Sequence, residues 1–115
     1  MTQHPETISP ETLMSWHQTQ HPFVLIDVRE PDEYQQANLK GRLIPLASVE
    51  TQLPKLDTDT TYVIHCKKGI RSDTATALMR AKGFEKTYSL EGGIEAWQTT
   101  YGDTCPWTTH TPPTL

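Results

Sequence analysis

One thiol stands among three cations in the stretch Tyr62–Ser72, YVIHCKKGIRS. A short β-branched run ends at Cys66, a loop with two lysines and a glycine follows, and Arg71 then leads into a helical pattern. Thiolates are nucleophiles, and neighbouring cations together with a helix N-terminus favour the thiolate over the thiol. The residue types and their spacing therefore predict that Cys66 is a nucleophile.

The elements on either side of Cys66 predict where this thiol lies. The apolar runs Phe23–Val28 and Thr61–Cys66 are typical of strands buried in a parallel sheet, and residues 71–82 follow a helical repeat with a glycine stop. In open parallel sheets, ligands gather where strands end and the next helices begin. We expect the backbone N–H groups from Lys67 to Ser72 to form an anion-binding ring around the sulfur there.

The rest of the chain alternates between helices and strands. Further helices are predicted near residues 9–19, 30–36, 48–56 and 92–100, and further strands near 41–46 and 86–90. Pro54 is expected to interrupt or end the third of these helices. This alternation indicates an α/β protein with a mainly parallel sheet. We expect an N-terminal extension over residues 1–8, a catalytic domain over 9–100, and an irregular Thr- and Pro-rich tail over 101–115.

Composition excludes several classes of protein. With 115 residues, 35% of them hydrophobic and 21% charged, the chain is expected to form one globular domain. Its two cysteines form no CxxC pair or His/Cys cluster, so we expect neither a disulfide scaffold nor a metal site, and no cofactor. The sequence has no apolar run near the roughly 18 residues needed to span a bilayer and no signal-like start, which predicts a cytoplasmic protein without membrane partners.

Charge is distributed unevenly along an acidic chain. The net charge of −4 argues against a nucleic-acid partner. Residues 1–60 carry nine acidic and four basic side chains, whereas six of the ten basic residues crowd between Lys67 and Lys86. A local cationic spot on an acidic protein indicates a small anionic ligand, although solvated lysines on a helix face would look similar.

The length of the loop bears on the reaction. A cysteine followed by a glycine-containing loop and an arginine is also the pattern of the phosphatase loop, but that loop has five residues between Cys and Arg. Only four residues separate Cys66 from Arg71. A smaller ring of N–H groups suits a single sulfur atom better than a tetrahedral phosphoryl group, so loop length favours sulfur chemistry.

Three segments resemble the motifs of the rhodanese family of sulfurtransferases, in matching order and spacing. LIDVREPDEY (Leu25–Tyr34) is similar to the family's first strand-and-turn signature, VIHCKKGIRS (Val63–Ser72) to its catalytic loop, and SLEGGIEAW (Ser89–Trp97) to its closing motif. One departure is NLKGRLIPL (residues 38–46), where the family often carries a Gly-His-Ile-Pro-Gly-Ala-like turn. The resemblance implies a rhodanese-like three-layer fold with helices on both faces of the sheet.

The resemblance also implies a two-step reaction. The Cys66 thiolate would attack the outer sulfur of a donor such as thiosulfate, sulfite would leave, and the resulting persulfide would pass its sulfur to cyanide, a thiol or a protein acceptor. Lys67 and Lys68 would attract the dianionic donor, and Arg71 would organise the loop or bind the anion. The expected substrate-binding loop comprises Lys67, Lys68, Gly69, Ile70, Arg71 and Ser72.

Several other residues are expected to support the site. Asp27 is interpreted as an anchor for loop backbone, with Arg29 and Glu30 as ion-pair partners, and Gly92 and Gly93 as a tight turn beside the site. Alternation turns His65 to the opposite face from Cys66, which predicts a sheet-packing histidine, and Trp97 is expected in the core. Cys105, in the tail, is a weaker candidate for resolving the persulfide as a disulfide.

Three functions remain open from the sequence. The leading hypothesis is a thiosulfate sulfurtransferase acting through Cys66. The second is a partner-binding module that carries a persulfide to a specific acceptor protein with little small-molecule turnover. The third, disfavoured by the loop length, is a phosphatase or arsenate reductase. Related folds host different chemistries, so the fold does not separate them.

Overall fold

A computed structural model describes residues 6–107. Five parallel strands form one sheet in the order β1-β5-β4-β2-β3, with β4 at its centre. The strands are β1 (Thr7–Ile8), β2 (Val24–Asp27), β3 (Arg42–Leu43), β4 (Tyr62–His65) and β5 (Thr87–Leu90). All four pairings are parallel, which confirms the expected α/β class.

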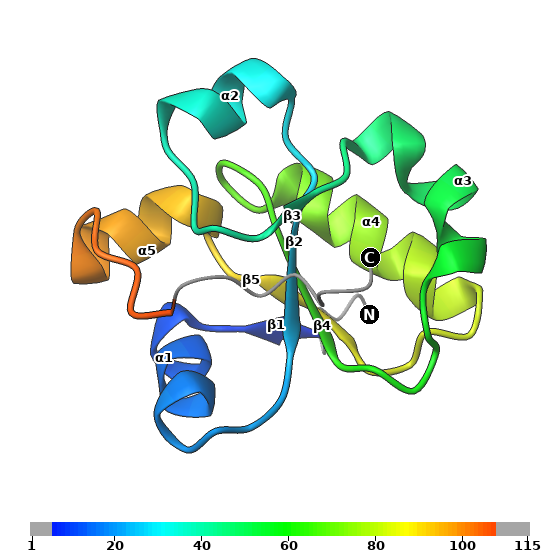
Figure 1. Cartoon of the computed structure of the whole chain (residues 1–115), viewed down its shortest axis with the longest axis horizontal. Helices are drawn as coiled ribbons and strands as arrows, with labels where there is room; N and C mark the ends of the chain where they lie inside the picture. Colours follow the sequence, from blue (N-terminus) through cyan, green and yellow to red (C-terminus); the bar gives the residue numbers. More distant parts are fainter. Residues whose placement is uncertain (1–5, 108–115) are drawn as a thin grey trace, which may run out of the picture.

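Helices cover both faces of this sheet and one of its ends (Figure 1). α1 (Pro10–Gln18) and α5 (Gly93–Tyr101) pack on one face, and α3 (Val49–Gln52) and α4 (Ile70–Ala81) pack on the other. α2 (Pro31–Gln36) lies beyond the carboxyl ends of the strands, close to the loop that joins β4 to α4. The layers confirm the predicted three-layer architecture.

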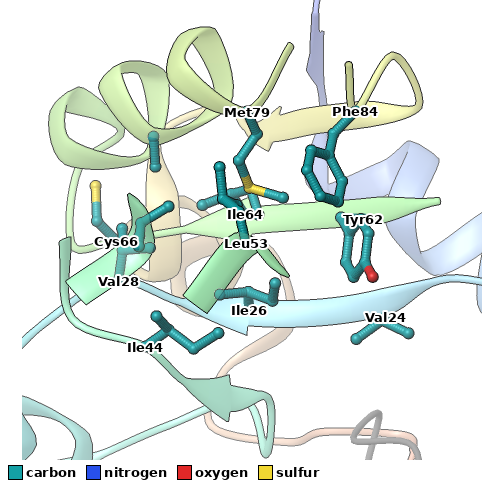
Figure 2. Packing of buried hydrophobic residues seen from close by; sticks show 12 residues of the cluster. Val24, Ile26, Val28, Ile44, Leu53, Tyr62, Ile64, Cys66, Met79 and Phe84 are labelled. Atoms are coloured by element: carbon teal, nitrogen blue, oxygen red, sulfur yellow. The ribbon is translucent and has the colours of Figure 1, made fainter. Parts of the chain in front are cut away.

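Alternation along β4 separates two hydrophobic cores. Tyr62 and Ile64 pack with α3 and α4, and Cys66, one residue beyond the strand, belongs to the same cluster. Figure 2 shows Cys66 at one end of this cluster with its sulfur directed toward α4. Val63 belongs to the other core, with Trp97 from α5. The strand therefore delivers the thiol on the side of the sheet where α4 begins.

Most predicted elements are present, with two differences. The expected strand over residues 41–46 extends only over Arg42–Leu43, because its one neighbour, β2, ends at Asp27, the partner of Leu43. The N–H groups of Ile44 and Leu46 still donate to Asp27 O and Val28 O at 2.9 and 3.1 Å. The second difference is β1, which the sequence did not reveal: residues 7–8 pair with β5 at an edge of the sheet.

Proline limits α3 as expected. The α-helix ends at Gln52, and a 3₁₀ turn over Leu53–Lys55 contains Pro54. Proline is tolerated in the first turn of a helical segment but cannot donate within an α-helix. Another 3₁₀ turn, Leu46–Ser48, precedes α3.

The turn before β3 replaces the glycine-rich turn of the resembling family. Lys40 adopts a left-handed conformation with φ of 63°, and its N–H donates to Asn38 Oδ1 at 2.8 Å. Gly41 follows where a Cβ atom would lie 2.9 Å from Leu25 O, and its carbonyl accepts from the Tyr34 hydroxyl at 2.8 Å. A side-chain hydrogen bond from Tyr34 thus joins this turn to α2, and the absence of a side chain at Gly41 lets it approach β2 closely.

The segment after α5 has no helix or strand up to residue 107, yet it packs firmly. Trp107 is buried in the core that contains Trp97, and its indole N–H donates to Leu39 O at 2.7 Å. Trp97 in turn donates to Thr104 O at 3.0 Å. Expectations for residues 1–5 and 108–115 lie outside the described residues. Among residues 6–107, no helix has the length and apolar character to cross a membrane.

Candidate active site

Cys66 lies at the turn from the central strand into α4. Its side chain is almost wholly buried, and its Sγ accepts hydrogen bonds from the backbone N–H of Gly69 at 3.1 Å and of Ser72 at 3.3 Å. The chain returns toward the sulfur at Gly69, whose φ of 112° is a conformation that glycine adopts without strain. Of the N–H groups expected to surround the sulfur, those of Gly69 and Ser72 therefore donate to it.

Two further N–H groups stand at the start of α4. Ile70 and Arg71 are the first residues of this helix, and their backbone N–H groups donate to no atom of the described residues. The first intrahelical bond of the helix is donated by Asp73, to Gly69 O at 3.0 Å. The free donors and the positive end of the helix dipole together favour negative charge at this end of the loop.

The carbonyl groups of the loop are held by α5. Ile94 N–H donates to Cys66 O at 2.8 Å, and Glu95 N–H donates to Lys67 O at 3.1 Å. This close approach requires a glycine at 93, since a Cβ there would lie 2.5 Å from both carbonyl oxygens. Gly92 and Gly93 both have positive φ, 74° and 64°, so the expected tight turn beside the site is confirmed.

Two serines bind the side of the loop that faces the sheet. Ser72 is fully buried, and its Oγ donates to Gly69 O at 3.1 Å and lies 3.5 Å from Cys66 Sγ. It accepts a hydrogen bond from Ser89 Oγ on β5 at 2.8 Å. The hydroxyl chain fixes the side of the loop that faces the sheet. Ser89 was not expected at the site; its polar side chain in a buried strand is the signal that identifies it.

Arg71 forms a bidentate ion pair with Glu33 of α2. Its two terminal nitrogens lie 2.7 and 2.9 Å from the two carboxylate oxygens, so the guanidinium ties the loop to α2. Of the two expected roles, organising the loop is the one that this geometry supports. Hydrogen bonding from Arg71 lowers the pKa of Glu33 from 4.5 to about 2. Glu33 was also missed, because nothing in its local sequence points to a partner 38 residues away.

Lys67 and Lys68 are exposed at the outer edge of the loop. Lys67 Nζ lies 3.9 Å from Glu95 Oε2, a long contact between two well-exposed side chains. Lys68 forms no ion pair with any residue from 6 to 107. Such surface contacts contribute little, and both ammonium groups therefore remain available to an anion from solvent.

Asp27 and Arg29 form a buried ion pair behind the loop. Asp27 Oδ2 lies 2.7 Å from Arg29 Nη2, and Asp27 Oδ1 accepts from the Arg29 backbone N–H at 3.0 Å. Arg29 also donates to Ala37 O at 2.7 Å, at the end of α2. The expected partnership of these two residues is confirmed. Glu30 is not part of it, because it is the N-cap of α2 and forms a capping box with Glu33.

His65 lies on the opposite face of β4 from Cys66, as alternation predicts. It is completely buried, with Nε2 3.5 Å from Asp27 Oδ2 and Nδ1 3.4 Å from Cys66 O. Burial lowers the pKa of His65 below 6.5, so the ring is neutral near pH 7. A buried, neutral histidine on this face of β4 agrees with the expected packing role.

Cys105 is not arranged to resolve a disulfide at the site. It packs against the core on the opposite face of the sheet from Cys66, and its thiol donates to Leu39 O at 3.3 Å. Burial raises the pKa of the Cys105 thiol, which disfavours the thiolate needed for attack on a persulfide. Both cysteines are unpaired. No cluster of three or more His, Cys, Asp or Glu side chains within residues 6–107 is arranged to hold a metal ion.

The family to which the chain belongs is shown by comparison with known protein families. A family model described as the rhodanese-like domain matches residues 9–100. The chain therefore belongs to the rhodanese family, and the three motifs read from its sequence lie within the matched region.

Similar proteins and a solved structure agree with this membership. The chain is 39% identical over 94 residues to a probable adenylyltransferase/sulfurtransferase, MoeZ, of Mycobacterium tuberculosis, covering 79% of this chain but only 24% of that protein. It is 33% identical over 79 residues to the thiosulfate sulfurtransferase GlpE of Pseudomonas fluorescens, covering 68% of this chain and 72% of that protein. The crystal structure of a rhodanese-related protein from Thermoplasma volcanium is 25% identical, with a TM-score of 0.76 over 84% of this chain and 93% of that one.

The close approach at Gly93 generates a prediction. Gly93→Ala should lower the free energy of unfolding by about 2 kcal/mol more than Gly83→Ala. Both glycines have positive φ, but an added Cβ at 83 meets no atom within 4 Å, so the difference reports the contact with the loop carbonyls. Urea unfolding measures the free energies, and the amide NMR signals of Gly69 and Ser72 should move only in the Gly93 variant. Equal effects of both substitutions would contradict the proposed contact.

The Arg71–Glu33 ion pair predicts a pH dependence of stability. Because the pKa of Glu33 is depressed in the folded state, the stabilisation is complete above pH 4.5 and is lost as the pH falls toward 2. In Glu33→Gln, the free energy of unfolding should therefore fall less between pH 5 and pH 3 than in wild type, by about 1 kcal/mol for a pair that is partly exposed. Asp32→Asn, one residue away on exposed surface, serves as the control and should keep the wild-type slope.

Proposed function

We propose that this protein is a sulfurtransferase that moves sulfane sulfur from thiosulfate or a similar anionic donor to a thiol or cyanide, through a persulfide on Cys66. The observation that carries the proposal is the ring around Cys66. It directs two N–H groups at one sulfur atom and leaves those of Ile70 and Arg71 free for a second. The kinship with thiosulfate sulfurtransferases agrees with this chemistry.

The first step transfers one sulfur atom and needs no acid. The Cys66 thiolate attacks the outer sulfur of thiosulfate, a new S–S bond forms, and the old S–S bond breaks with its electron pair leaving on sulfite. In the second step the acceptor attacks the outer sulfur of the persulfide, and the electron pair of the broken bond returns to Cys66. The negative charge near the loop N–H groups is retained throughout the cycle.

The cations divide their roles in this proposal. Lys67 and Lys68 attract the dianionic donor from solvent, because neither is held in a short ion pair. Arg71 keeps the loop in shape through Glu33 rather than meeting the donor. A free thiol as nucleophile and a thiol as acceptor suit a reducing compartment, and we therefore assign the proposed reaction to the cytoplasm.

A second candidate function is a persulfide-carrying module that serves one acceptor protein. The observation that favours it is Ile70 at the start of α4, which is 77% exposed close to the two lysines. An acceptor protein that docked over the loop would bury this apolar side chain, which stabilises the complex. This module would form the same persulfide but would turn over thiosulfate and cyanide poorly.

Intact mass after incubation with thiosulfate tests the first step. The wild-type protein and Cys105→Ser should both gain one sulfur, about 32 Da, and lose it on addition of cyanide, whereas Cys66→Ser should gain nothing. Slow turnover of a persulfide that forms fully would favour the carrier module. The absence of any gain in wild type, combined with turnover of an aryl phosphate, would replace the sulfurtransferase by a phosphatase.

Donor attraction by the lysines predicts a salt-dependent effect. Replacement of Lys67 and Lys68 by Ala should raise the KM for thiosulfate by about tenfold at low salt and by less at high salt, where charges are screened. Steady-state kinetics at several ionic strengths measure both. Lys82→Ala together with Lys86→Ala removes the same charge at a distance from the loop and should leave the KM near the wild-type value. A KM that is the same in wild type and in the Lys67/Lys68 variant, at low and at high salt, would contradict the assigned role.

A further inference from the structure

A polar groove extends from the catalytic loop between α2 and α5. It consists of two adjoining hollows that share the lining residues Gln36, Ala37, Ile94 and Gln98. The first hollow, about 320 Å³, reaches Lys67 and Glu95, and the second, about 290 Å³, continues to Leu39 and Asp103. In Figure 1, the loop after β4 lies between α2 and α5.

The groove is joined physically to the loop that carries Cys66. Ile94 and Glu95 line it and also donate their backbone N–H groups to the carbonyls of Cys66 and Lys67. On the other wall, Glu33 lines it and holds Arg71. A molecule lying in the groove would therefore reach the edge of the catalytic loop at one of its ends.

The size of the groove exceeds what a small anion needs. Each hollow alone is near the lower end of the range, roughly 300–1,000 Å³, in which proteins bind whole organic ligands. Thiosulfate or cyanide would fill a small part of either hollow. The groove thus has room for a larger substrate, and the acceptor is the substrate whose size the reaction leaves open.

The lining favours a peptide over an apolar ligand. Gln36 and Gln98 stand on opposite walls, and each amide offers both a donor and an acceptor, as the backbone of an extended peptide does. The Gln36 side chain is exposed and forms no hydrogen bond with a described residue, while Gln98 makes one long bond, 3.3 Å, to Asp103. Both amides are therefore available to a bound chain.

We propose that this groove binds the sulfur acceptor as an extended, cysteine-containing peptide segment, with its thiol at the loop end. The inference rests on the proposed function and names the acceptor class of the same site. The acceptor thiol loses its proton to solvent and attacks the outer sulfur of the Cys66 persulfide. A new S–S bond forms on the peptide, the S–S bond at Cys66 breaks, and its electron pair returns to Cys66 as thiolate, so no external oxidant or reductant is consumed.

A single-turnover experiment tests the groove. The full-length protein is loaded with thiosulfate, freed of excess donor, and checked for the added sulfur by intact mass. It is then mixed with either a blocked pentapeptide that has cysteine at its centre and glycine elsewhere, or with N-acetylcysteine amide. In wild type, discharge at equal subsaturating concentration should be about tenfold faster with the peptide, a difference that a few hydrogen bonds supply.

Matched variants on α2 separate the groove from general effects. Gln36→Trp fills the groove and should bring the peptide rate down to that of N-acetylcysteine amide, whereas Gln35→Trp, on the adjacent exposed position outside the groove, should keep the tenfold preference. Equal rates for the two acceptors in wild type, or an equal preference in both variants, would overturn the inference. A protein that loads no sulfur would instead sink the proposed function, so the two failures are distinguishable.

Discussion

The catalytic loop keeps its conformation because α5 and the start of α4 bind its carbonyl groups. The carbonyls of Cys66 and Lys67 accept from N–H groups in the first turn of α5, and that of Gly69 accepts from the Asp73 N–H and the Ser72 hydroxyl. In the conformation that these bonds hold, the N–H groups of Gly69 and Ser72 donate to Cys66 Sγ. Helix α5 is thus part of the site without contributing a side chain to the sulfur, and its position depends on the absence of a side chain at Gly93.

Charge at the site is arranged in two layers. The inner layer consists of two short ion pairs, Asp27–Arg29 and Glu33–Arg71, which connect β2, α2 and the loop. The outer layer, Lys67 and Lys68, is solvated and weakly paired. Burying an ion pair costs desolvation free energy, so these pairs serve to fix the positions of the elements. Exposed cations act on an approaching anion over a distance that depends on the salt concentration. The chemistry proposed for Cys66 therefore relies on backbone dipoles at contact distance and on lysines for the approach of the donor.

Local patterns in the sequence were sufficient for the strand–loop–helix unit around Cys66. The apolar run before it, the glycine within the loop and the helical repeat after it each have a short-range cause, and so does the Gly92–Gly93 turn. Long-range pairings had no such signal. Glu33 meets Arg71 only because α2 folds over the rim, β1 is two residues long, and Trp107 enters the core from a segment whose composition indicates an irregular tail. Those contacts follow from the assembled sheet and not from any window of the chain.

Both edges of the sheet are occupied by very short strands. β1 and β3 are two residues each, and Pro45, close after β3, has no N–H to offer a further strand. An additional chain therefore finds only a few backbone groups with which to extend the sheet, and edge-to-edge association is disfavoured. A domain with such short edge strands can lie beside other domains of a longer polypeptide without strand pairing between them. One relative is such a longer protein, since this chain covers 24% of it.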